Sequence, residues 1–127
     1  YRWYLSRGFE ANELTPNAPP RGVQEVIERA LVELRDETAK EGTALTVLVF
    51  PWLRPLELWP GSMPPKRAWI LATLERLGIR HFDFLPTLEQ ALADGVEVME
   101  KSHDPQHPSL EFGRLMARDM LAAGFMP

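Results

Sequence analysis

The residues most able to do chemistry lie in a short polar loop near the C-terminal end of the chain. The sequence His-Asp-Pro-Gln-His-Pro-Ser spans residues 103–109 and places Asp104 three residues before His107. A carboxylate at this spacing can accept a hydrogen bond from imidazole Nδ1, which fixes the tautomer and leaves Nε2 able to take up a proton. Pro105 and Pro108 stiffen the backbone, and a residue before proline is restricted to extended conformations. The loop is therefore predicted to hold an acid–base pair.

Two other interpretations of this loop remain open. Asp104 could form an ordinary surface turn, with His107 exposed beside it. Alternatively, His103, Asp104 and His107 could ligate a metal ion, because imidazole and carboxylate groups both bind divalent metals. The two prolines restrict closure of the loop around one ion. Ser109 has the side chain of a helix N-cap and would anchor the loop to the helix that follows.

The elements that must position this loop alternate between helices and strands. Apolar residues at helical spacing predict helices over residues 23–40, 66–77, 87–93 and 109–123. Strands are predicted over 43–50, a nearly continuous apolar run expected to be covered on both faces, and over 79–85. This order of elements predicts an α/β layered fold with a parallel sheet. Two strands rarely make a stable sheet alone, so further strands are expected upstream.

Local signals add detail to these elements. Gly42, Gly78 and Gly95 are placed to end the first three helices, and residues 51–65, with five prolines, are predicted to form a long loop. The last helix is predicted to bury an apolar stripe made of Leu110, Met116, Ala117, Met120 and Leu121.

The N-terminal part has a different character. Residues 1–127 are long enough for a single domain, of which residues 1–22 are predicted to form an irregular connection. The chain begins at Tyr1 without an initiator Met, and its first five residues resemble the middle of an amphipathic helix. We therefore expect the chain to be the C-terminal portion of a longer protein.

Composition excludes several classes of function. The net charge is −4, with no basic cluster of the kind that nucleic-acid binding needs. The chain has no cysteine, which excludes disulfides, thiolate zinc sites and cysteine nucleophiles. Its longest apolar run, residues 45–53, is far shorter than the roughly 20 residues that span a bilayer. The composition is otherwise that of an ordinary globular domain.

The loop and its surroundings resemble a known family. The run Asp-Pro-Gln-His-Pro-Ser, followed by Glu-Phe-Gly and an apolar helix, is similar to the last conserved block of SGNH/GDSL hydrolases. The segments VLVFP (47–51), LERLGI (74–79) and FDFLPTLEQAL (82–92) agree with this resemblance, which extends over residues 23–125. It implies a three-layer αβα sandwich with a parallel, flavodoxin-like sheet that is incomplete at its N-terminal side.

The resemblance also implies roles for individual residues. His107 would be the general base of a serine hydrolase that cleaves an ester through an acyl-enzyme, and Asp104 would orient it. Gly113 matches a family position where a small residue lets the last helix pack closely. No metal or organic cofactor is implied, and the substrate would be a small-molecule, carbohydrate or lipid ester. A polysaccharide O-acetyltransferase on the same scaffold and a non-catalytic α/β interaction domain are the alternatives.

The chain departs from the family pattern in its nucleophile and oxyanion hole. The family's Gly-Asp-Ser segment is absent, and none of Ser6, Ser62, Ser102 and Ser109 lies in the strand-to-helix turn that exposes a nucleophile. Asn12 lacks the Gly-x-Asn-Asp context of an oxyanion donor. The serine and the oxyanion donors are therefore expected from an upstream part of the same protein.

The remaining candidates have ordinary structural interpretations. His81 is predicted to pack on its strand, and Asp83 to cap the helix that follows. Trp52, Trp59 and Met63 lie in the proline-rich loop, where they would either line a wall for an acyl group or pack the loop against the core.

Overall fold

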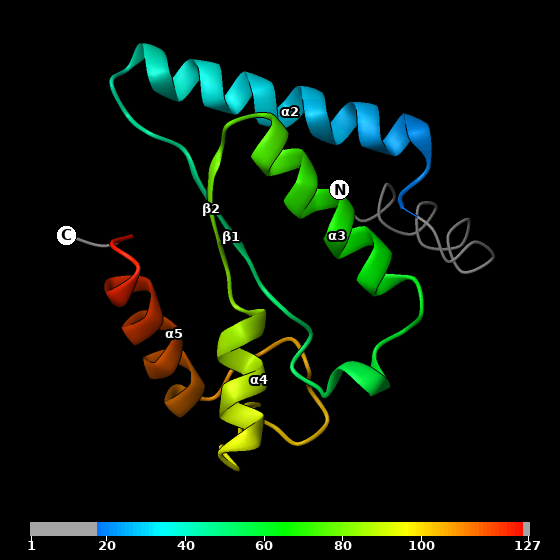
Figure 1. Cartoon of the computed structure of the whole chain (residues 1–127), viewed down its shortest axis with the longest axis vertical. Helices are drawn as coiled ribbons and strands as arrows, with labels where there is room; N and C mark the ends of the chain where they lie inside the picture. The colour runs from blue at the N-terminus through cyan, green and yellow to red at the C-terminus, as the bar shows by residue number, and fades with distance from the viewer. Residues whose placement is uncertain (1–17, 126–127) are drawn as a thin grey trace. The chain divides into compact units, whose positions relative to one another are not determined.

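The structure, a computed structural model, describes residues 18–125 and is of mixed α/β class (Figure 1). In this part of the chain, four α-helices, one short 3₁₀ helix and two strands follow one another. They are α2 (Arg21–Lys40), β1 (Thr46–Val49), the 3₁₀ helix η1 (Leu56–Leu58), α3 (Met63–Arg76), β2 (Arg80–Asp83), α4 (Leu85–Ala93) and α5 (Leu110–Ala122). Strands β1 and β2 pair as a two-stranded parallel sheet. The predicted order of helices and strands and the parallel sheet are confirmed.

The chain divides into two compact units. The first comprises Tyr1–Thr46 and Pro60–Arg80 and contains α2 and α3. The second comprises Val47–Trp59 and His81–Pro127 and contains η1, α4, α5 and nearly all of the sheet. The loop with Asp104 and His107 therefore belongs to the second unit. Most of the predicted N-terminal connection, with the helix-like first residues, lies outside the described residues.

Helix boundaries follow the local sequence chemistry. Gly42, Gly78 and Gly95, just after α2, α3 and α4, have φ angles of 72°, 65° and 73°, a left-handed conformation that glycine adopts without steric cost. The predicted helix ends are confirmed. Helices α3 and α4 begin earlier than expected because prolines occupy their first turns, where a missing N–H group removes no helical hydrogen bond. The predicted loop 51–65 is correspondingly shorter and contains η1.

In the first unit, polar contacts connect the C-terminal end of α3 to α2. The guanidinium of Arg76 forms an ion pair with the carboxylate of Glu28, and Arg35 Nη1 donates to the carbonyl oxygen of Leu77 at 2.7 Å. Leu74 and Ile79 are buried. Helix α2 has no fully buried residue, and Val26 and Leu34, two members of its apolar stripe, are exposed.

The core of the second unit is partly aromatic. Phe84 is fully buried, and its ring centroid lies 5.0 Å from that of Phe50 and 4.9 Å from that of Phe82. These distances fit the favourable tilted and edge-to-face arrangements of aromatic pairs. Phe50 is nevertheless 59% exposed, and Leu48 is also exposed. Alternate residues of an extended segment point to the same side, so the exposure of Leu48 and Phe50 leaves one face of this segment uncovered. The prediction that residues 43–50 are covered on both faces is therefore wrong.

Helix α5 buries a narrower stripe than the sequence predicts. Phe112 is completely buried and Met116 is buried one turn later, whereas Leu110 is 74% exposed. Ala117 and Leu121 are exposed as well. A helix turns about 100° per residue. Ala117, one residue after Met116, and Leu110, two residues before Phe112, therefore point away from the buried face. The predicted burial of Leu110, Ala117 and Leu121 is wrong, and Phe112 takes the central place.

Candidate functional site

The loop that contains Asp104 and His107 is closed at its base by backbone pairing. Met99 and Pro108 form an isolated antiparallel β-bridge. Beside the bridge, the N–H group of Glu100 donates to the carbonyl oxygen of His107 at 3.0 Å. The backbone of His107 is thus held by the opposite side of its own loop.

Ser109 fastens the end of this loop to α5. Its Oγ accepts a hydrogen bond from the N–H group of Phe112 at 3.0 Å, and its hydroxyl donates to the carbonyl oxygen of Glu97 at 2.6 Å. Its own N–H group donates to Val98 at 2.9 Å. The predicted N-cap is confirmed, because the side chain satisfies an N–H group that the first helical turn leaves without a partner.

The tip of the loop is joined to the segment that follows β1. The N–H group of Leu53 donates to the carbonyl oxygen of Pro105 at 3.0 Å, and that of Asp104 donates to Lys101 at 3.0 Å. Reactive groups in open α/β sheets gather beyond the carboxyl ends of the strands. The loop is hydrogen-bonded to the segment that leaves such an end.

Asp104 and His107 contact each other directly. Imidazole Nδ1 lies 2.7 Å from Asp104 Oδ2, and the other carboxylate oxygen accepts a hydrogen bond from the N–H group of Gln106 at 3.2 Å. The spacing predicts this contact. The His107 side chain is 66% exposed and that of Asp104 is 33% exposed, so a reactant can approach the ring.

The electrostatics of the pair favour an ionised carboxylate. The hydrogen bond from His107, followed by the one from the N–H group of Gln106, holds the pKa of Asp104 below its usual value of 3.8. Because an ionised carboxylate only accepts hydrogen bonds, Nδ1 must carry the proton in this contact. Neutral His107 then has its lone pair on Nε2, which is the tautomer of a general base. The pair can therefore take up a proton at Nε2 and support the resulting imidazolium.

Neither a nucleophile nor a metal site accompanies the pair in the described residues. Among residues 18–125, no serine hydroxyl is hydrogen-bonded to His107, and Ser109 is engaged as the helix cap. Ser6 and Asn12 lie outside the described residues. The described part also contains no group of three or more His, Asp or Glu side chains arranged to hold a metal ion. The metal-binding interpretation of His103, Asp104 and His107 is therefore not supported.

An apolar hollow of about 260 Å³ adjoins the loop. Two of its lining residues, Gln106 and Pro108, flank His107 in the chain, and the others come from the segment after β1 and from α5. The complete set is Phe50, Pro51, Leu53, Gln106, Pro108, Phe112 and Met116. The sequence does not predict this hollow, because Phe112 falls outside the apolar stripe that the last helix is expected to bury. The only signal was its position one helical turn before Met116.

The other predicted candidates have structural roles or separate positions. Trp59 is buried and its Nε1–H donates to the carbonyl oxygen of Arg54 at 2.8 Å, which favours packing of the loop over a substrate wall. Asp83 Oδ1 accepts a hydrogen bond from the N–H group of Leu85 at 3.0 Å, at the start of α4 as predicted. His81 is half-buried on β2, and Met63 begins α3 in the other unit.

Gly113 does not mark a close approach of α5 to another described element. A Cβ atom at Gly113 would meet no atom within 4 Å. Within residues 18–125, the close packing expected at this position is not found: Phe112 makes the buried contacts, and Gly113 lies at the side of the buried face.

Comparison with known proteins finds no matching family model, curated protein or solved structure. Among the helices of residues 18–125, none combines the length and apolarity that crossing a membrane requires.

Proposed function

We propose that the chain is the C-terminal part of an SGNH-type ester hydrolase, in which His107 is the general base and Asp104 its positioning partner. The observation that supports this proposal best is the 2.7 Å contact between His107 Nδ1 and Asp104 Oδ2 on an exposed loop tied to the segment after β1. The two-stranded sheet would be completed to a three-layer αβα sandwich by strands from polypeptide outside the 127 residues.

The reaction follows from the tautomer that Asp104 imposes. As the serine oxygen attacks the ester carbonyl carbon, Nε2 of His107 removes the hydroxyl proton. When the tetrahedral intermediate collapses, the bond between the carbonyl carbon and the alkoxy oxygen breaks, and Nε2 returns the proton to the departing alcohol. Water then attacks the acyl-enzyme with the same help, releasing the acid and restoring the serine. Asp104 keeps its negative charge throughout and stabilises the imidazolium.

The hollow beside the loop suits the acyl part of the substrate. Its lining is apolar apart from the amide of Gln106, and its volume of about 260 Å³ favours short acyl groups over long chains. The exposed His107 ring next to it leaves the alcohol part of the ester on the solvent side. A short-chain ester of a small molecule or carbohydrate is the substrate class that fits best.

The test needs the protein with its upstream sequence and a short-chain chromogenic ester. His107→Ala is expected to lower kcat by at least about three orders of magnitude, the range found when one member of a catalytic triad is removed. His103→Ala is the matched control, because His103 lies in the same exposed loop outside the hydrogen-bonded pair, and its activity should stay near the unmodified value. Near-normal turnover by His107→Ala, or no turnover before mutation, would refute the proposal.

A further inference from the structure

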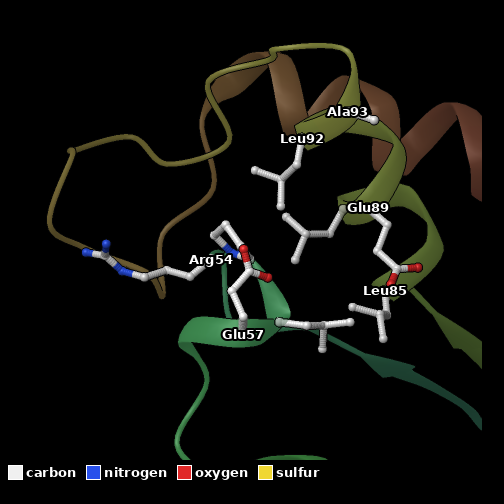
Figure 2. Close-up of a pocket in the computed structure, with 9 residues that line it drawn as sticks. Arg54, Glu57, Leu85, Glu89, Leu92 and Ala93 are labelled. Atoms are coloured by element: carbon white, nitrogen blue, oxygen red, sulfur yellow. The ribbon is translucent and has the colours of Figure 1, made fainter.

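A second hollow, of about 370 Å³, lies in the second unit between α4 and the segment around η1 (Figure 2). Helix α4 comes directly after β2 in the chain, and the segment around η1 comes after β1, so both walls of the hollow leave the carboxyl end of a strand. Its lining consists of Arg54, Pro55, Leu56, Glu57, Leu85, Leu88, Glu89, Leu92 and Ala93, and includes neither Asp104 nor His107. A site here is therefore separate from the proposed acid–base pair.

The lining is mainly aliphatic. Leu85, Leu88 and Leu92 are spaced three and four residues apart, so they lie along one face of α4. In Figure 2 the side chain of Leu92 extends from α4 toward the segment that bears Glu57. Leu56 is exposed on that segment, so apolar surface remains accessible to a ligand. A hydrocarbon or aromatic body would gain free energy by covering it.

The segment opposite α4 is held in place before any ligand arrives. Trp59 is buried and donates its indole N–H to the carbonyl oxygen of Arg54 at 2.8 Å. The N–H group of Leu58 donates to Pro55 at 2.9 Å within the turn of η1. These bonds fix the backbone on both sides of Glu57, so that binding needs little ordering of the chain.

The charges available to a ligand are negative. Among residues 18–125, neither Glu57 nor Glu89 has a hydrogen-bond or ion-pair partner for its carboxylate, and both are exposed. The guanidinium of Arg54 is engaged elsewhere, 5.9 Å from the ring centroid of Trp52. Figure 2 shows it extending away from Leu92 and Glu89. Two carboxylates around an apolar surface complement a ligand that is both cationic and hydrophobic.

We propose that this hollow binds a small amphiphilic cation, an organic ammonium with a compact hydrocarbon or aromatic body. The volume is at the lower end of the range for small-molecule sites, which suits a ligand of about ten non-hydrogen atoms. The body covers the accessible apolar surface of Leu56, Leu85 and Leu92, and the ammonium group is attracted by the carboxylates of Glu57 and Glu89 in the lining. A ligand of this size binds weakly, with a dissociation constant on the order of 1 mM.

The proposal is tested on the full chain by titration with 2-phenylethylammonium, followed by backbone amide chemical shifts. Saturable shifts are expected in α4 and in residues 54–58. Two probes of the same size separate charge from hydrophobicity: neutral 2-phenylethanol and anionic phenylacetate. The ammonium should bind at least about fivefold more tightly than the alcohol, given the free energies of exposed charge pairs, and phenylacetate most weakly.

Three variants locate the interaction. Glu57→Gln and Glu89→Gln should each weaken binding of the ammonium about two- to fivefold and leave binding of the alcohol unchanged. Glu97→Gln, an exposed glutamate of the same unit outside the hollow, is the matched control and should change nothing. Preference for phenylacetate, equal binding of all three probes, or shifts that arise outside α4 and residues 54–58 would each overturn the proposal.

Discussion

The N–H group of Leu53 donates to the carbonyl oxygen of Pro105 at 3.0 Å, which joins the segment after β1 to the tip of the Asp104–His107 loop. Leu53 is buried, so loss of this bond would leave a buried polar group unsatisfied, at a cost of about 1–3 kcal/mol. Together with the bridge between Met99 and Pro108, it fixes the loop at two points. A site that depends on orientation needs this kind of support.

The hydrogen bond between the side chains of Asp104 and His107 predicts how the stability of the chain depends on pH. Because the pKa of Asp104 in the folded chain lies below 3.8, its carboxylate contributes stability that is complete above that value. This contribution is lost as the pH falls through the lower, folded-state pKa. A titration of the Asp104 side-chain carboxyl carbon by NMR is expected to give a pKa below 3.8.

The partner of Asp104 provides the control for that titration. In His107→Ala the pKa of Asp104 should rise toward 3.8 but stay below it, because the N–H group of Gln106 still donates to the carboxylate. In His103→Ala it should not move. An unchanged pKa in His107→Ala would show that the two side chains do not interact in solution.

The fold was predictable where local chemistry determines it. Helical periodicity located all four described helices, and the glycines after α2, α3 and α4 ended them as expected. The prediction failed where burial depends on tertiary partners. Leu48 and Phe50 belong to an apolar run typical of a covered strand, yet they are exposed because burial depends on what packs against the sheet. The sequence predicts the start of α3 too late, because clustered prolines are typical of loops, whereas the first helical turn accepts them.

The candidate site, like the fold, was predictable only where it depends on residues that are close in sequence. The contact between Asp104 and His107 depends on three residues of local spacing and on a stiff backbone, both of which are visible in the sequence. The two hollows are not local. Phe50 and Phe112 both line the first, and Glu57 and Glu89 both line the second, although they are far apart in the sequence. No periodic pattern in the chain indicates that these distant segments meet.

Ser109 is expected to contribute measurably to stability through its two side-chain hydrogen bonds. Ser109→Ala removes the acceptor for the N–H group of Phe112 and the donor to Glu97, and should lower the free energy of unfolding by about 1–2 kcal/mol. Urea denaturation followed by circular dichroism measures this change. Ser102→Ala, an exposed position in the same loop, is the control and should stay within about 0.5 kcal/mol of the unmodified chain. Equal stabilities of the two variants would contradict the role of Ser109 as a cap.

Two apolar residues of α5 that lie close in sequence should differ strongly in their contribution to stability, because one is buried and the other is exposed. Phe112→Ala should lower the free energy of unfolding by about 3–5 kcal/mol, because the ring is completely buried and its removal leaves a cavity. Leu110→Ala should change it by less than about 0.5 kcal/mol, because Leu110 is 74% exposed. Phe112→Leu should fall between them, which keeps the comparison possible if Phe112→Ala does not fold. A loss for Leu110→Ala as large as that for Phe112→Leu would mean that α5 is rotated about its axis.

Two glycines should respond in opposite directions to the same substitution. Gly113→Ala should raise the free energy of unfolding by about 0.5–1 kcal/mol, because alanine is the better helix former and its Cβ would meet no atom within 4 Å. Gly78→Ala should lower it by about 1–2 kcal/mol, because its φ angle of 65° is strained for a residue with a Cβ atom. Thermal denaturation of both variants measures the two signs. A loss of stability in Gly113→Ala would show that another surface packs closely on α5 at this glycine.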